Sequence, residues 1–333
     1  MKYSAGYQLC LTPDFREAIL RLRDRIGEVY FSWGDFANGR NSLPLTDGLT
    51  PWEAQRRQEE DLAAFSGQGI ALNLLFNATC YGRDSLSRAF FTKVGNTVDY
   101  LAGRYALRGI TTTSPLIARF IHENFPGLDV RASVNMGIGS VEGMDYVAEY
   151  FDSFYAAREY NRDFVRLAEL QAWCGRHAKK LYGLANSGCL NRCSAHMFHD
   201  NLVAHEAEIA AMDNGYAFEG ICRRYLAKPE NRAALLTHTS FVRPEDTGLY
   251  EGLFEGLKLA TRVSPCPVRI LQAYAAGHFR GNILELLEPN HAGLIHPYVL
   301  ENSRIESRVE DGKLSYTNLE EAMIDREEDY ADE

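Results

Sequence analysis

The hydrophobic positions of the chain alternate between short continuous apolar runs and longer stretches with the spacing of amphipathic helices. Short apolar runs bounded by glycine, asparagine or charged residues are typical of strands that are buried on both faces of a sheet. Eight such runs are present, at residues 4–9, 28–33, 70–77, 109–113, 130–135, 153–159, 180–186 and 257–261. This alternation predicts an α/β protein with a mainly parallel sheet.

Helical segments separate the predicted strands, and several begin with a recognisable signal. A proline at the first helical position and a Ser, Thr or Asp before it are typical of helix N-termini. The signals are Thr12 with Pro13, the capping-box spacing of Thr50 and Glu53, Ser114 with Pro115, and Pro267 before the last helix. Segments 163–177 and 197–212 continue the same pattern.

Eight strand–helix units in about 290 residues fit a (β/α)8 barrel of the TIM type. A doubly wound open sheet would produce the same alternation, and it often carries a G-x-G-x-x-G motif after the first strand. No such motif follows the first predicted strand, and Gly137-Ile138-Gly139 after the fifth lacks the rest of it. We therefore predict a (β/α)8 barrel over residues 1–290.

Two segments depart from the regular alternation. Residues 213–256 form a long insertion between the seventh helix and the eighth strand, and an insertion of this length is usually functional. Residues 291–333 form a C-terminal extension with an acidic tail. From Thr317 onward, eight acidic residues stand against Arg326 alone, a pattern typical of a solvated, poorly ordered end.

Composition and charge restrict the cellular setting and the partners. The net charge of −10 argues against nonspecific nucleic-acid binding, because phosphate neutralisation supplies most of that affinity. No run of about 18 apolar residues predicts a membrane span, and the N-terminus does not have the pattern of a secretory signal. We expect a cytoplasmic protein. Seven cysteines, an odd number, favour metal ligands or nucleophiles over a disulfide framework.

Polar residues cluster at the ends of the predicted strands, where barrel enzymes place their active sites. The residues are Gln8, Asp35, Asn77, Thr112, Asn135, Arg158, Glu159, Asn161, Asn186 and Arg262. Each one alone could satisfy the backbone of a loop, but together they predict a polar pocket on one face of the barrel.

Within this set we expect Arg158 and Glu159 to be catalytic. Glu159 is the candidate for proton transfer because it lies beside Arg158 at a strand end. The alternative is that the two residues form a structural ion pair. The residues expected to bind a polar substrate are Asn135, Asn161, Asn186 and Arg262.

The segment ANSGCLNRCSAHMFHDNLVAHE, residues 185–206, contains the densest group of metal-ligand side chains. Cys189 and Cys193 follow the seventh predicted strand and are close enough in sequence to bind one metal centre. Cys222 lies in the insertion, which can fold back, and Cys266 follows the eighth strand, next to the seventh in a barrel. Converging thiolates of this kind predict an iron–sulfur cluster.

The fourth ligand and the identity of the metal remain open at this point. Cys10 and Cys80 also lie at strand ends and are alternatives to Cys266, whereas Cys174 lies inside a helix and is assigned to packing. His196 and His199 could complete a tetrahedral Zn site with the two loop cysteines, although a helix start commonly places histidines in capping or surface roles. A Cys–His nucleophile pair has no orienting third group at a recognised spacing.

These segments also resemble a known family. The blocks ITTTSPLIARFIHENFP, VRASVNMGIGSVEGMDY, REYNRDF, LANSGCLNRCSAHMFHDNLVAHE, VRPED, KLATR and LLEPNH are similar to the collagenase-like peptidase family of unassigned catalytic type. The resemblance extends from the first strand to about His291, and it is to the compact branch without an added C-terminal domain.

The resemblance implies two activities. The family is named for proteolysis, whereas some members bind a [4Fe–4S] cluster and act in oxygen-independent hydroxylation of ubiquinone precursors or of tRNA and rRNA bases. Those members carry cysteines after the seventh strand, and Cys189 and Cys193 match that location. Cys222 matches a further ligand less specifically, and the resemblance supplies no match for the fourth.

Three functions follow from the sequence. The first is an iron–sulfur enzyme that modifies a quinone precursor or an RNA base. The second is a peptidase that uses a metal or a thiol, although the chain lacks H-E-x-x-H and G-x-S-x-G motifs. The third is a noncatalytic scaffold that binds a partner protein through its acidic tail.

Overall fold

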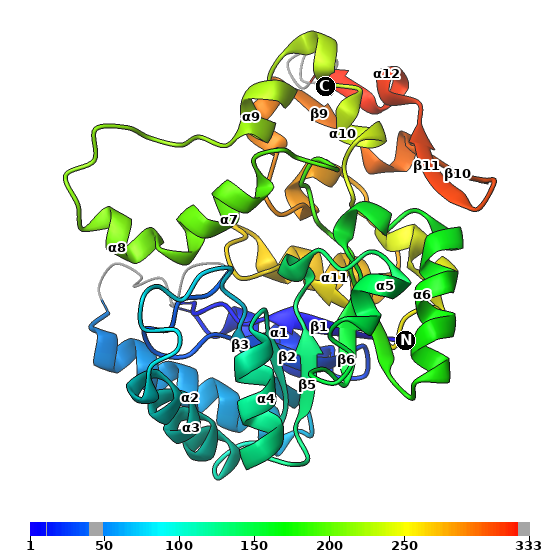
Figure 1. Cartoon of the computed structure of the whole chain (residues 1–333). Helices are drawn as coiled ribbons and strands as arrows, with labels where there is room; N and C mark the ends of the chain where they lie inside the picture. The colour runs from blue at the N-terminus through cyan, green and yellow to red at the C-terminus, as the bar shows by residue number, and fades with distance from the viewer. Residues whose placement is uncertain (11, 40–48, 326–333) are drawn as a thin grey trace.

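The computed structural model describes residues 1–10, 12–39 and 49–325 (Figure 1). Eight parallel strands pair in chain order, and β8 pairs back with β1 to close a barrel. The strands are β1 (Lys2–Gly6), β2 (Ile26–Phe31), β3 (Ala71–Phe76), β4 (Leu107–Thr112), β5 (Asp129–Ala132), β6 (Ser153–Tyr155), β7 (Lys180–Leu184) and β8 (Gly256–Leu259). The predicted (β/α)8 fold is confirmed.

Helices alternate with the barrel strands and also occur in the insertion and the C-terminal extension. They are α1 (Asp14–Arg21), α2 (Pro51–Gly67), α3 (Arg88–Ala102), α4 (Pro115–Asn124), α5 (Val141–Asp145), α6 (Phe164–Arg176), α7 (His196–Ala204), α8 (Glu206–Ala210), α9 (Ile221–Leu226), α10 (Ala234–Thr237), α11 (Pro267–Ala276) and α12 (Leu319–Ala322). Thr50 and Glu53 form the predicted capping box at α2. The single helix predicted over 197–212 is divided at His205, whose backbone is not helical.

All eight strands are present, but most of them end two to four residues earlier than the apolar pattern predicts. The apolar run of the sixth strand illustrates the reason. Ala156 and Ala157 are buried, yet the chain has already turned toward the 3₁₀ helix η2 (Arg158–Tyr160), so burial continues beyond the last strand pairing. Consequently, polar residues predicted at strand ends lie in the loops just beyond them.

The interior of the barrel contains a buried polar layer as well as apolar side chains. Arg131 on β5 forms ion pairs with Glu28 on β2, at 2.8 Å, and with Asp129. Its guanidinium also lies 4.4 Å from the ring centre of Tyr182 on β7. Because the described carboxylates neutralise this cation inside the barrel, we interpret the layer as structural.

The insertion folds mainly into short helical segments, and it carries α9, α10 and the 3₁₀ helix η4 (Pro244–Tyr250). The C-terminal extension forms two small antiparallel sheets, in which β9 (Tyr298–Leu300) pairs with β12 (Met323–Asp325) and β10 (Glu306–Glu310) pairs with β11 (Lys313–Thr317). The strands and α12 lie above the barrel in Figure 1.

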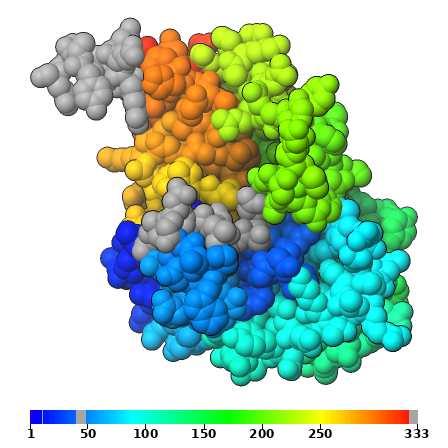
Figure 2. Space-filling view, turned by 90° about the vertical axis from the view of Figure 1, so that its left-hand side faces the viewer, coloured from blue at the N-terminus to red at the C-terminus, as the bar shows by residue number. Residues whose placement is uncertain are grey.

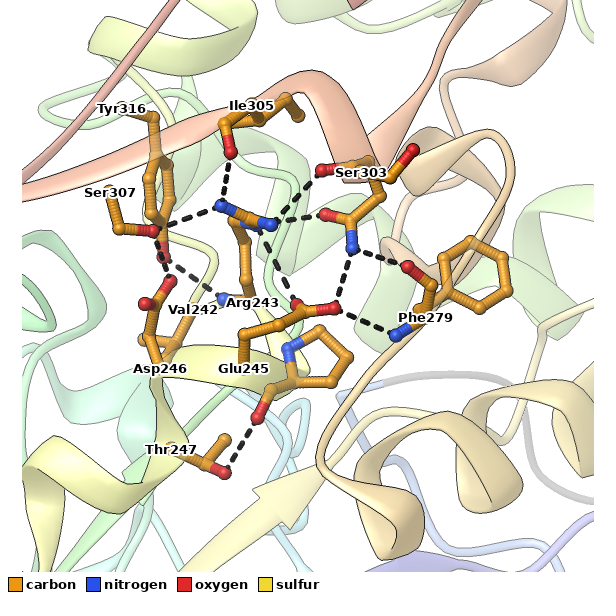
Figure 3. A network of polar contacts seen from close by, with 12 residues as sticks. Val242, Arg243, Glu245, Asp246, Thr247, Phe279, Ser303, Ile305, Ser307 and Tyr316 are labelled. Atoms are coloured by element: carbon orange, nitrogen blue, oxygen red, sulfur yellow. Dashed lines mark hydrogen bonds and ion pairs between the residues drawn. The ribbon is translucent and has the colours of Figure 1, made fainter.

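Arg243 connects the insertion to the extension (Figure 3). Its buried guanidinium donates to the side-chain and backbone oxygens of Asn302, at 2.8 and 3.0 Å, and to the carbonyl of Ile305 at 2.7 Å. A further bond reaches Ser307, and the backbone N–H of Arg243 donates to the hydroxyl of Tyr316. The extension is therefore docked through a buried cation.

The described part of the acidic tail differs from the expected disordered end. Ala322 is buried, and residues 323–325 pair with β9, which gives this segment a helix and a strand. Residues 326–333 lie outside the described residues. No helix in the described part of the chain is both long and apolar enough to cross a membrane.

Candidate functional site

A small cavity of about 50 Å³ lies beyond the C-terminal ends of the barrel strands. Of the strand-end residues predicted from the sequence, Asn77, Asn135, Arg158 and Arg262 line it. The other lining residues are Tyr30, Gly39, Val134, Leu184, Lys258, Ala260, Val263 and Glu288. We call this space the mouth cavity. Its lining combines polar side chains from the strand ends with apolar ones.

Arg158 is the residue that links the mouth cavity to the cysteines. It is buried at the start of η2, with 6% of its surface exposed. One Nη atom donates to Asn135 Oδ1 at 3.0 Å, and the other donates to Cys189 Sγ at 3.3 Å. Its buried Nε has no hydrogen-bond partner among the described residues. Asn135 in turn donates to the carbonyl of Asn77, which fixes the amide.

Two further buried cations face the same cavity. Arg262 donates to Ser32 Oγ at 3.1 Å and to Asn38 Oδ1 at 2.7 Å, which are both neutral groups. The ammonium of Lys258 lies 3.9 Å from the ring centre of Tyr30. Glu288 is the carboxylate among the described residues that line the cavity. The described lining therefore contains both cations and a carboxylate, which suits a polar group.

The loop that carries Cys189 and Cys193 is held on both sides by backbone contacts. Gly188 N–H donates to the carbonyl of Glu288, and Asn191 N–H donates to the carbonyl of His238. Arg192 has a φ angle of 56°, so the chain turns sharply just before Cys193. Both thiols are half-buried.

Cys222 on α9 is a neighbour of these two thiols. Burial raises the pKa of the Cys222 thiol, and the electrostatic influence of the Cys189 and Cys193 thiols raises it further. This electrostatic influence indicates that α9 lies in the neighbourhood of the loop, and the role of Cys222 as a third ligand stays a prediction. In the described part of the chain, however, no three His, Cys, Asp or Glu side chains are close enough together to hold a single metal ion.

The remaining cysteines lie elsewhere. Cys266 caps α11, and its Sγ lies 3.7 Å from the carbonyl of Glu285, so its role as a fourth ligand stays a prediction. Cys10 is near Asp61, and Cys80 contacts His205. Cys174 is fully buried in α6, consistent with packing.

The other predicted site residues have structural partners or lie beside the cavity. Asn161 donates to the carbonyls of Leu184 and Ser240, and Asn186 exchanges hydrogen bonds with the backbone of Ala260 and donates to Leu286. Glu159 is half-buried and is not part of the cavity lining, and no ion pair joins it to Arg158 among the described residues. The substrate and catalytic roles of these three residues remain predictions.

The histidines of the loop segment point away from a shared metal position. His196 Nε2 lies 3.2 Å from Asp200 Oδ2, and the ring of His199 packs against Phe218 at 5.3 Å between centroids. A histidine that the sequence did not single out is closer to the cysteine loop. His291 is fully buried, and its Nε2–H donates to the carbonyl of Gly188 at 2.8 Å. Burial lowers the pKa of His291, with Arg223 acting in the same direction.

The comparisons with known proteins agree with the fold and with the resemblance. No family model matches the chain. The uncharacterized protease MJ1657 of Methanocaldococcus jannaschii is 26% identical over 304 residues, which cover 87% of this chain and 83% of that protein. The structure of the U32 peptidase Mk0906 superposes with a TM-score of 0.53 at 14% identity, over 78% of this chain and 91% of that one. The sequence similarity is to a protein that is named a protease, and the structural similarity shows the barrel fold.

Proposed function

We propose that the protein is an enzyme that binds an iron–sulfur cluster beside the mouth of its barrel. The observation that supports this proposal is the contact between Arg158, which lines the mouth cavity, and Cys189 Sγ, with Cys193 in the same loop and Cys222 within electrostatic range of both thiols. Cysteine thiolates are the usual ligands of such clusters. Arg158 contacts both features, and an N–H donated to a ligating sulfur stabilises the negative charge of a bound cluster.

The donor set fits a cluster better than it fits a single ion. The three thiols are neighbours, yet they are not packed together as the ligands of one zinc ion would be. A cluster spreads its ligands around several irons, so it suits thiols with this looser grouping. Cys266 remains the predicted fourth ligand, although in this arrangement its thiol faces Glu285.

The cavity lining defines what the substrate would contact. Arg158 and Asn135 would bind a polar group of the substrate. When bound, the cluster would supply one-electron chemistry next to this position. A quinone precursor or an RNA base remains the proposed substrate class, with hydroxylation or a related modification as the reaction.

Anaerobic purification tests the proposal directly. We expect visible absorbance and about four irons per chain, as for a [4Fe–4S] centre. Cys189→Ser, Cys193→Ser and Cys222→Ser should each lose iron, whereas Cys174→Ala, in the packed core, should retain it. A colourless protein with stoichiometric zinc, or full iron content in the three loop variants, would refute the cluster.

A second function is favoured by the relative that is named a protease. Under this alternative the chain would hydrolyse peptides, and purified protein without iron would cleave a peptide library. Peptide cleavage that persists after iron removal would favour the peptidase. Iron-dependent modification of an aromatic substrate with no cleavage would favour the first proposal.

A further inference from the structure

A second cysteine centre lies on the surface between the β3–α3 loop and the α7–α8 segment. The thiol of Cys80 lies next to the ring of His205, since a Cβ atom on Gly82, two residues further along the chain, would be 4.0 Å from His205 Cε1. His205 Nδ1 lies 3.1 Å from Glu208 Oε2. The backbone N–H of Gly82 donates to Cys80 Sγ at 3.4 Å. Cysteine, histidine and carboxylate therefore follow one another in a line, with the second ring nitrogen of His205 left for the thiol.

The local structure holds this line in place. Next to Cys80, the hydroxyl of Thr79 donates to Asn201 Oδ1 on α7 at 2.6 Å, which fastens the two segments together. His205 is the residue between the end of α7 and the start of α8, so both helices fix the position of its backbone. Figure 2 shows this yellow-green helical segment resting on the cyan surface that follows β3.

We propose that Cys80, His205 and Glu208 form a nucleophilic centre for acyl transfer, separate from the cysteines of the loop segment. His205 would accept the proton of Cys80, and Glu208 would orient the ring and stabilise its charge. The thiolate attacks the carbonyl carbon of an ester or amide, so a C–S bond forms and the C–O or C–N bond breaks. His205 gives its proton to the leaving group, and water then releases the acid and the free thiol.

The electrostatics agree with this geometry. The hydrogen bond with His205 lowers the pKa of Cys80, and the same bond raises the pKa of His205. Two other thiols shift in the opposite direction, because burial raises the pKa of Cys10 and raises that of Cys174 to about 11. Cys80 is also only half-buried, so a reagent can reach it.

The neighbouring surface indicates the class of acyl compound. A groove of about 970 Å³ is lined by α7, α8 and the segment after them, with Phe198, Leu202, Val203, Ile209, Tyr216 and Phe218 as its apolar side chains. Glu208 lies on α8 and His205 lies between the two helices, so both are close in sequence to residues that line the groove. We infer that the substrate carries an apolar chain on its acyl side, which would bury apolar surface in this groove. This inference goes beyond the proposed cluster and does not depend on it.

Alkylation of the full-length protein by iodoacetamide, located by mass spectrometry, tests the activated thiol. At pH 7 we expect Cys80 to react at least about tenfold faster than Cys10, its matched control, because the thiolate is the reactive form. His205→Gln should lower the alkylation rate of Cys80 by about tenfold and leave that of Cys10 unchanged. Glu208→Gln should lower the rate at Cys80 by a smaller factor. Equal rates at the two cysteines, or an unchanged Cys80 rate in His205→Gln, would refute the proposal.

Acyl transfer is tested with p-nitrophenyl butyrate and p-nitrophenyl acetate. Acid quenching should trap a butyryl group on Cys80, and Cys80→Ser and Cys80→Ala should lose hydrolysis while Cys174→Ala keeps it. Phe218→Ser should lower the preference for butyrate over acetate. Iron content separates this centre from the cluster, because both Cys80 variants should retain iron. Loss of iron in them, or an acyl group on another residue, would contradict the inference.

Discussion

The guanidinium of Arg158 donates to the thiol of Cys189 across 3.3 Å, and it thereby joins the end of β6 to the loop after β7. The same side chain holds Asn135 at the end of β5. One buried cation thus connects three successive strand ends with the proposed cluster site. A charged group that is buried with two neutral partners is costly to remove without compensation.

The first prediction follows from this contact. Arg158→Met should destabilise the fold by about 1–3 kcal/mol, because Asn135 loses its buried donor. It should also release iron faster to a chelator. Arg158→Lys is the matched control, since it keeps the charge but cannot reach both partners with a planar fork. We expect the stability of Arg158→Lys in urea and its iron retention to lie between those of the parent protein and those of Arg158→Met. Unchanged stability and iron binding in Arg158→Met would contradict the assignment.

Gly188 provides a second prediction about the cysteine loop. A Cβ atom at this position would lie 2.8 Å from the carbonyl oxygen of Pro289 and 3.1 Å from Leu287 Cβ. Gly188→Ala should therefore displace the loop and cost about 1–3 kcal/mol, with loss of iron. In α6, Gly175 has no atom within 4 Å of its would-be Cβ, so Gly175→Ala should stabilise by about 0.5–1 kcal/mol. Equal effects of the two substitutions on the urea midpoint would rule out the steric explanation.

His291 predicts a pH dependence of stability. Because burial lowers its pKa in the folded protein, the unfolded chain takes up a proton first as the pH falls below 6.5. The stability contribution of neutral His291 is complete above that pH and is lost on acidification. His291→Gln, which can still donate to Gly188, should show a smaller loss of stability between pH 7.5 and pH 5.5. His278 is exposed, so His278→Gln serves as the control. If His291→Gln loses as much stability on acidification as the parent protein does, His291 is not the group responsible.

Arg243 predicts how firmly the extension is docked. Arg243→Met should leave the oxygens of Asn302 and Ile305 without their donor and cost about 3 kcal/mol or more. Limited proteolysis should then cut the chain near residues 298–325 before the barrel unfolds. Arg308→Met, at an exposed ion pair with Glu306, should change stability by less than about 1 kcal/mol. Protease resistance equal to that of the parent would show that other contacts are sufficient.

The sequence predicted the barrel because apolar residues repeat differently along buried strands and along amphipathic helices. Each element shows this repeat in its own short segment of sequence. It also placed Asn135, Arg158 and Arg262 at one rim, since parallel strands end on one face. The sequence placed Cys222 near the loop cysteines only because the insertion is long enough to fold back, and its role as a ligand stays a prediction.

Other features depend on contacts that spacing does not encode. Cys80 and His205 are 125 residues apart in the numbering of the chain, and only the docking of α7 on the β3–α3 loop makes them neighbours. In the sequence, His291 only marks the end of the region that resembles the peptidase family. Its burial beside Gly188 arises from tertiary packing. The apolar runs predicted strands that are too long, because buried residues continue into η2 and the following loops.

The pairing of β1 with β8 has a consequence for how the chain is made. Residues 2–5 of β1 pair with residues 256–259 of β8, so the last strand pair of the barrel cannot form until β8 has been synthesised. A ribosome that adds about 5–20 residues per second leaves the open edge of β1 unpaired for many seconds. An unpaired strand edge is a template for association with other chains. Newly made copies of this protein should therefore depend on chaperone capture, or on slow synthesis at low temperature, far more than the finished barrel does.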